Sequence, residues 1–147
     1  MRKITLLASA FFLSLAVMAQ PKADEVAKFN TEKHDFGKLK AGVPVTYTFE
    51  IKNIGTKPLV VESASATCGC TVPEKPTDPI MPGETAKLKV QYNAAAVSPF
   101  TKDVYVTFAG IAQPKSFQIT GEVLTAEAYD AWAKEQSDKK STKKPNN

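Results

Sequence analysis

The sequence is poor in the residue types from which catalytic and metal sites are usually built. Its 147 residues include one histidine, His34, and two cysteines, Cys68 and Cys70. A serine–histidine–acid triad needs an imidazole beside a nucleophile and a carboxylate, and a single histidine leaves no ready set. A glycine-rich phosphate loop is also missing from the sequence. We therefore expect a protein that is not an enzyme, with no catalytic residues and no cofactor.

The excess of one sign of charge is also small. The chain has 19 basic and 15 acidic side chains, which give a formal net charge of +4. Residues 1–19 hold Arg2 and Lys3 and no acid, so the remainder has 17 basic and 15 acidic side chains, a net charge of +2. Much of that base lies close to the C-terminus. Because the body is nearly neutral, nucleic acid is not an expected partner.

The longest hydrophobic run lies at the N-terminus. Residues 1–19 begin with the basic pair Arg2-Lys3, continue through an apolar stretch and end at Ala19, before polar sequence. This three-part pattern is typical of a cleaved secretory signal peptide, with an uncleaved anchor as the alternative. The apolar run is short for a bilayer, which needs about 20 apolar residues. We expect an exported protein, periplasmic or extracellular, with no stable membrane span after cleavage.

Alternating apolar and polar residues dominate the middle of the chain. In residues 43–53, apolar side chains from Val45 to Ile51 alternate with polar ones, the period-two pattern of a half-buried strand. Short antiparallel strands separated by turn residues are typical of a β-sandwich. We predict an all-β fold over residues 28–124, an immunoglobulin-like antiparallel sandwich of about seven strands. The same rhythm recurs in residues 86–92, 103–108 and 117–123.

Prolines interrupt this pattern in one segment. Pro73, Pro76, Pro79 and Pro82 recur at every third position, and this regular spacing suits neither a central strand nor a helix. We predict an extended crossover with polyproline character, closed by a turn at Pro82-Gly83.

The segments that flank the predicted sandwich have different compositions. Residues 20–27 are mostly polar, and we predict a flexible lead-in there. Residues 125–137 follow a helical pattern, which predicts a short helix. We expect its Tyr129 and Trp132 to dock on the sandwich, with a partner site as the alternative. Residues 138–147 are lysine-rich and predict a disordered basic tail.

Several short motifs follow one another in a fixed order from about Lys33 to Val123. The motifs are Asp35-Phe36-Gly37, Gly42, Phe49, Asn53, Gly55, Pro58-Leu59, Cys68-Gly69-Cys70-Thr71, Pro73, Pro76, Pro79-Ile80 and Pro82-Gly83. This pattern resembles the bacterial family known as domain of unknown function 1573. The resemblance implies an immunoglobulin-like sandwich on an exported protein, commonly from Bacteroidetes-type bacteria, with no established activity. Lys75 and the alanine-rich segment 93–99 depart from the family pattern.

The two cysteines are the leading candidates for a functional site. In an extended strand, Cys68 and Cys70 would lie about 6.6 Å apart with their side chains on one face, near the upper limit for a disulfide. Gly69 lets the backbone tighten toward such a bond. Four interpretations stay open: a local structural disulfide, two reduced buried cysteines, a thiol–disulfide exchange site, or a soft-metal site for Cu(I) or Zn.

Other candidate residues have simpler explanations. A lone histidine such as His34 is more often a surface or capping residue than a ligand, and Met81 is the nearest downstream thioether. Asp35 is expected to accept backbone hydrogen bonds in a turn at Gly37.

Two functional hypotheses follow from these observations. The first is a non-enzymatic module that binds or scaffolds proteins of the cell envelope, with an exposed sheet edge as a place for a partner strand. The second is a thiol-redox or copper-handling domain centred on Cys68 and Cys70. The sequence makes no prediction of the oligomeric state.

Overall fold

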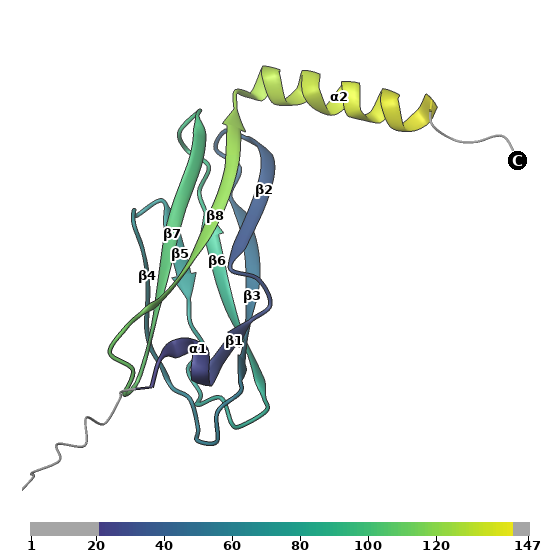
Figure 1. Cartoon of the computed structure of the whole chain (residues 1–147). Coiled ribbons are helices and arrows are strands. Elements are labelled where there is room, and N and C mark those ends of the chain that lie inside the picture. Colours follow the sequence, from purple (N-terminus) through teal and green to yellow (C-terminus); the bar gives the residue numbers. More distant parts are fainter. Residues whose placement is uncertain (1–20, 143–147) are drawn as a thin grey trace, which may run out of the picture.

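Two four-stranded β-sheets, packed face to face, form the body of the molecule (Figure 1). The computed structural model describes residues 21–142. The first sheet has the order β1–β3–β6–β5 and the second sheet β2–β8–β7–β4. The predicted immunoglobulin-like sandwich is confirmed, with eight strands in the described residues where about seven were expected. The strands are β1 (Ala27–Phe29), β2 (Lys33–Lys40), β3 (Val45–Asn53), β4 (Val61–Ala66), β5 (Thr71–Glu74), β6 (Thr85–Tyr92), β7 (Pro99–Phe108) and β8 (Lys115–Leu124).

The hydrophobic core lies between the two sheets, where apolar side chains from alternating positions meet. Burying one large apolar side chain stabilises the folded state by roughly 1.5–3 kcal/mol. The same alternation fixes the register, because a slip by one residue would turn a whole apolar set toward solvent. Large, fully buried side chains are Phe49, Ile51, Leu88 and Val90 in the first sheet and Val104, Val106, Phe108 and Ile119 in the second.

Strand β2 differs from the antiparallel expectation because it pairs with β8 in parallel. The chain reaches β2 from β1 of the other sheet, so no hairpin turn dictates the direction of the strand. A bulge between Asp35 and Lys38 shifts the register. Within it, the Asp35 carboxylate accepts a hydrogen bond from the Gly37 backbone N–H at 2.9 Å, and Gly37 has a φ of 68°. The expected role of Asp35 in a turn at Gly37 is thus present in the structure.

Residues 21–27 of the lead-in are ordered, although flexibility was predicted, and residue 20 lies outside the described residues. Residues Ala23–Val26 form the one-turn helix α1, and β1 follows at once. Ala23 and Ala27 are buried in the core. The Lys115 ammonium at the start of β8 forms ion pairs of 2.6 Å with Asp24 and with Glu32. The polar composition of this segment did not reveal its order. The segment is held by the buried Ala23 and Ala27 and by the ion pair of Lys115 with Asp24.

The proline-rich segment is partly a strand rather than a continuous crossover. Pro73 lies in β5, at the edge of the first sheet, where a residue without an N–H is tolerated. Further along, Ile80 forms an isolated β-bridge with Leu59. The predicted turn at Pro82-Gly83 is present, with a Gly83 φ of 84°.

Helix α2 (Ala126–Thr142) is longer than the predicted helix over residues 125–137. Residues 138–142, assigned to a disordered tail, are helical, and 143–147 lie outside the described residues. Figure 1 shows α2 running away from the end of the sandwich. The rings of Tyr129 and Trp132 lie 5.6 Å apart and belong neither to the core nor to the side chains packed against it. Both rings therefore lie outside the core, and their docking on the sandwich stays a prediction.

The predicted signal peptide, residues 1–19, lies outside the described residues. Within the part that is described, no helix combines the length and the apolar character needed to cross a membrane.

Candidate functional site: the Cys68–Cys70 turn

The two cysteines lie where the chain crosses from the second sheet to the first. Residues 67–70 join the end of β4 to the start of β5. On one side of this crossing, the Thr67 N–H donates to the Asp103 carbonyl of β7 at 3.1 Å. On the other side, the Asn93 N–H, just after β6, donates to the Cys70 carbonyl at 3.0 Å. Backbone hydrogen bonds to both sheets therefore hold the Cys68–Cys70 turn in place.

Cys68 and Cys70 are joined by a disulfide, with their Cα atoms 5.3 Å apart. This separation is shorter than the extended-strand value because the segment turns: the Thr71 N–H donates to the Cys68 carbonyl at 3.2 Å. The bond closes a ring of three residues, which in the chain-entropy model stabilises the fold by about 1.6 kcal/mol, against about 3 kcal/mol for a 15-residue loop. The bond therefore contributes little as a staple.

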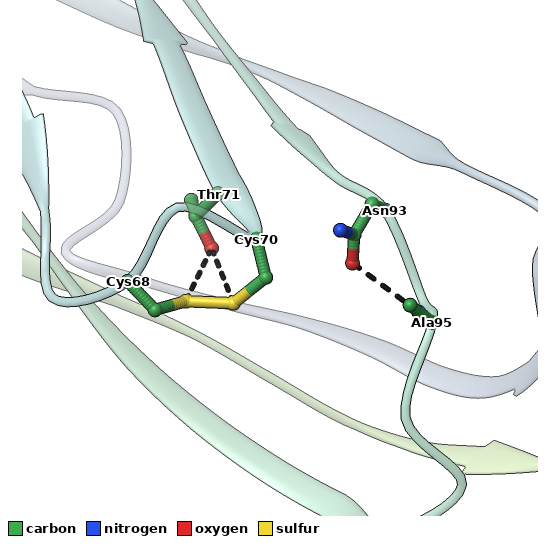
Figure 2. The surroundings of a disulfide bond; sticks show 5 residues. All are labelled: Cys68, Cys70, Thr71, Asn93 and Ala95. Carbon is green, nitrogen blue, oxygen red and sulfur yellow. Dashed lines mark hydrogen bonds between the residues drawn. A yellow bond between two sulfur atoms is a disulfide. The ribbon is translucent and has the colours of Figure 1, made fainter.

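One hydroxyl group lies against both sulfur atoms (Figure 2). The Thr71 Oγ1 atom is 3.8 Å from the Cys68 Sγ and 4.0 Å from the Cys70 Sγ. Thr71 is only 4% exposed, whereas both cysteine side chains are half-buried. Cys70 packs against the core, and Gly69 between the cysteines is exposed. Thr71 belongs to the motif found in the sequence, but a role for its hydroxyl beside the sulfur atoms was not predicted.

A metal site at the cysteines has no further ligands in this structure. The described residues contain no cluster of three or more His, Cys, Asp or Glu side chains that could hold a metal ion. Met81 lies in the loop between β5 and β6, where the Gly83 N–H bonds to Asn53, at the end of the first sheet opposite the Cys68–Cys70 turn.

His34 has an aromatic partner instead of a ligand role. Its imidazole stacks on the Tyr47 ring at 3.5 Å and meets Phe36 edge-on at 4.6 Å. Desolvation lowers the pKa of His34 below its ordinary value, and the Asp35 charge acts weakly in the opposite direction. Burial therefore favours the neutral form of the ring.

Most of the other motif residues have structural roles. Asn53, fully buried, donates from Nδ2 to the Ile80 carbonyl at 2.7 Å and the Lys57 carbonyl at 2.8 Å, and its Oδ1 accepts from the Gly55 N–H at 2.9 Å. The Gly83 N–H in turn donates to the Asn53 carbonyl. The loop after β3, which holds Gly55, and the loop before β6, which holds Gly83, thus meet at Asn53.

A second surface feature lies next to the Cys68–Cys70 turn and was also missed. Residues 41–44 and 93–98, here called the tip loops, contain no charged residue. The Gly42 N–H donates to the Ala94 carbonyl at 2.9 Å, so the two loops are joined. Val43 and Val97 are 49% and 54% exposed. The signal that could have indicated this surface was the lack of charge in both loops.

The fold and the site together define the class of protein. It is an immunoglobulin-like β-sandwich in which a disulfide spans a tight turn between the two sheets, instead of linking distant strands. The particular family is also clear: the chain belongs to the family described as protein of unknown function (DUF1573), whose model matches residues 27–123. The resemblance found in the sequence is thereby confirmed. Among curated proteins, no sequence matches this chain.

Solved structures with the same fold share little sequence with this chain. A protein of unknown function from Porphyromonas gingivalis W83 has a TM-score of 0.57 and 18% identity, over 66% of this chain and 46% of that one. The VesB protease of Vibrio cholerae has a TM-score of 0.55 and 14% identity, over 69% of this chain and 33% of the protease. The PapD-like domain 7 of human CEP192 has a TM-score of 0.54 and 13% identity, over 86% of this chain and 99% of that domain.

These likenesses show the fold alone. The chain spans less than half the length of the Porphyromonas protein and a third of the length of the protease. In contrast, it spans nearly the whole of the human PapD-like domain.

Proposed function

We propose that this chain is an exported, non-enzymatic module that binds a protein partner in the cell envelope. The observation that carries the proposal is the surface of the tip loops, where exposed apolar side chains stand on a fixed backbone. Exposed apolar groups that lie close together mark interaction sites more often than isolated ones do. The N-terminal leader pattern supports export, and the sequence lacks a catalytic set.

The tip loops are suited to binding because their backbone is already ordered. Besides the bond between Gly42 and Ala94, the Val123 N–H donates to the Ser98 carbonyl at 3.0 Å, and the Val43 N–H donates to the Lys40 carbonyl at 3.1 Å. Ala94 is fully buried. A surface that is ordered before it meets its partner loses less conformational entropy on binding.

The partner's chemistry follows from the tip loops themselves. Loops that present valine, proline and alanine without charge contact an apolar surface, so the partner is a protein with an exposed apolar patch. The Val43→Asp/Val97→Asp double variant should lose binding, because it buries two unpaired carboxylates in the interface. Ile54→Asp is the matched control, because Ile54 is similarly exposed, at 47%, and lies directly after β3, beside Asn53.

Site-specific photocrosslinking in the source cells tests this assignment. A photoreactive residue at position 97 should give one discrete adduct with an envelope protein, and the adduct should disappear when Val43→Asp is added. The Ile54→Asp variant should retain it. Equal adduct yield from a photoreactive residue at position 54, or no adduct from position 97, would contradict the proposal.

Export can be tested separately on the same cells. Cleavage after Ala19 should leave a mature protein that begins at Gln20, found in the envelope or the medium. Intact mass and N-terminal sequencing of the purified protein measure this directly. A cytoplasmic protein that retains Met1 would overturn the localisation and leave the binding surface untouched.

A further inference from the structure

We propose that the Cys68–Cys70 disulfide is a thiol-exchange site that accepts two electrons from a dithiol. The proposal goes beyond the binding function and does not depend on it, because the chemistry takes place at the sulfur atoms and uses no exposed side chain of the tip loops. Its substrate class is a small dithiol or a protein with two neighbouring thiols. Three features of the turn carry the inference: access to the sulfur atoms, a hydroxyl group beside them, and a backbone that does not depend on the bond.

Access to the sulfur atoms comes from their position at the surface. Both cysteine side chains are half-buried, and a Cβ added at Gly69 would have no neighbouring atom within 4 Å. No other segment therefore covers Gly69, and the partly exposed sulfur atoms are within reach of an incoming thiolate. Cys70 packs against the core while Cys68 does not, so Cys68 Sγ is the more open target.

The hydroxyl of Thr71 lies where a leaving thiolate needs a donor. In the disulfide form, Oγ1 is within 4.0 Å of both sulfur atoms, and Thr71 is almost fully buried. When the bond breaks, a sulfur gains negative charge, and this hydroxyl can donate a hydrogen bond to it. A donor to the thiolate lowers the pKa of the leaving thiol, and a thiol with a lower pKa leaves faster.

The reduced turn is expected to keep its shape. The bonds from Thr67 to Asp103 and from Asn93 to Cys70 are backbone bonds that do not involve sulfur. Because the closed ring has only three residues, the disulfide adds little stability. The two thiols therefore stay close together after reduction, so the exchange is reversible.

The reaction balances in two steps. A substrate thiolate attacks Cys68 Sγ, a mixed disulfide forms, and the Cys68–Cys70 bond breaks with its electron pair on Cys70 Sγ. The second substrate thiolate then attacks the substrate sulfur of the mixed disulfide and releases Cys68 as a thiolate. Each released thiolate takes up a proton. In sum, the dithiol is oxidised to a disulfide and the cysteine pair is reduced to two thiols.

The test uses the full mature chain with dithiothreitol as the dithiol probe. Alkylation of free thiols at timed intervals, followed by mass spectrometry, should show reduction of the pair while circular dichroism stays that of the folded protein. The Thr71→Val variant should slow this reaction about tenfold, because a hydrogen bond to a charged group is lost. Thr71→Ser, which keeps the hydroxyl, should restore the rate, and Thr48→Val on the outer face of β3 should leave it unchanged.

The site of attack has its own test. With oxidised glutathione as the probe, the Cys70→Ser variant, whose free thiol is Cys68, should form a mixed disulfide faster than the Cys68→Ser variant. A pair that resists dithiothreitol until the protein unfolds overturns the proposal. If Thr71→Val is reduced by dithiothreitol as fast as the Thr48→Val control, the hydroxyl has no role. If the two serine variants form the mixed disulfide equally fast, Cys68 is not the preferred target. None of these results bears on the crosslinking at the tip loops, so the two proposals fail separately.

Discussion

The side chain of Asn53 is the clearest case of one residue holding distant segments together. Replacing it with alanine should lower the free energy of unfolding by about 3 kcal/mol, because the Ile80 carbonyl and the Gly55 N–H lose their partner. Urea denaturation measures the loss. The exposed Asn30, whose Oδ1 accepts from the Glu50 N–H, is the matched control, and Asn30→Ala should cost less than about 1 kcal/mol. Equal losses for both variants would contradict the role assigned to Asn53.

Gly121 shows how closely β2 approaches β8. A Cβ at this position would lie 2.8 Å from the Phe100 ring and 2.9 Å from the Gly37 carbonyl oxygen. We expect Gly121→Ala to destabilise the fold by about 2 kcal/mol, since the β2 bulge or the ring must move. In Gly69→Ala, the added methyl group has open space, and the change should stay within about 0.5 kcal/mol. Thermal unfolding of both variants decides this, and a harmless Gly121→Ala would refute the close approach.

The sequence identified the two cysteines of the candidate site, but not the contacts that position them. Cys68 and Cys70 two residues apart, with Gly69 between them, suggested a local bond. The separation of 5.3 Å depends on the turn at Thr71, and the fixed crossing depends on Asp103 and residues after β6. Contacts between segments so distant in sequence leave no local pattern, so spacing alone did not reveal them.

At the level of elements, Lys115 holds the N-terminal segment against β8. Hydrogen bonds to Asp24 and then to Glu32 raise the pKa of Lys115 above its ordinary value of 10.5, although burial opposes them. A raised pKa in the folded state means that the charged lysine stabilises the fold fully below about pH 10.5. That contribution is lost as the pH rises through the folded-state pKa.

Lys115→Met should therefore destabilise the protein by about 1 kcal/mol at pH 7 and by less at pH values above 10.5. Denaturant titrations of both proteins at the two pH values measure the difference. Amide hydrogen exchange in β1 should also become faster in the variant at pH 7, because α1 and β1 lose their anchor. A destabilisation that grows with pH would have the wrong sign for this ion pair.

Sequence patterns predicted the central strands well and the edges poorly. Strands β3, β6, β7 and β8 alternate strongly because one face of each is buried. Edge strand β2 has Leu39 as its one buried residue, so its pattern was weak. Pro73 argued against a strand, yet β5 is an edge, where the missing N–H costs no ladder bond.

At the scale of the whole molecule, α2 is an appendage of the sandwich. Its ion pair to the body, Lys40 with Asp130 at 2.9 Å, joins side chains that are 35% and 55% exposed. An exposed pair of this kind contributes about 0.5 kcal/mol or less after solvent screening. The helix should therefore fold and unfold largely independently of the two sheets.

Deleting residues 126–147 should consequently change the free energy of unfolding of the sandwich by less than about 1 kcal/mol. The unfolding transition, followed by urea denaturation, should also keep its midpoint and its cooperativity, since no residue of α2 belongs to the core. Lys40→Ala in the full chain is the matched control for the ion pair. If the deletion cost more than Lys40→Ala by several kcal/mol, α2 would have to pack on the sandwich through Tyr129 and Trp132, and the separation of the helix from the core would be wrong.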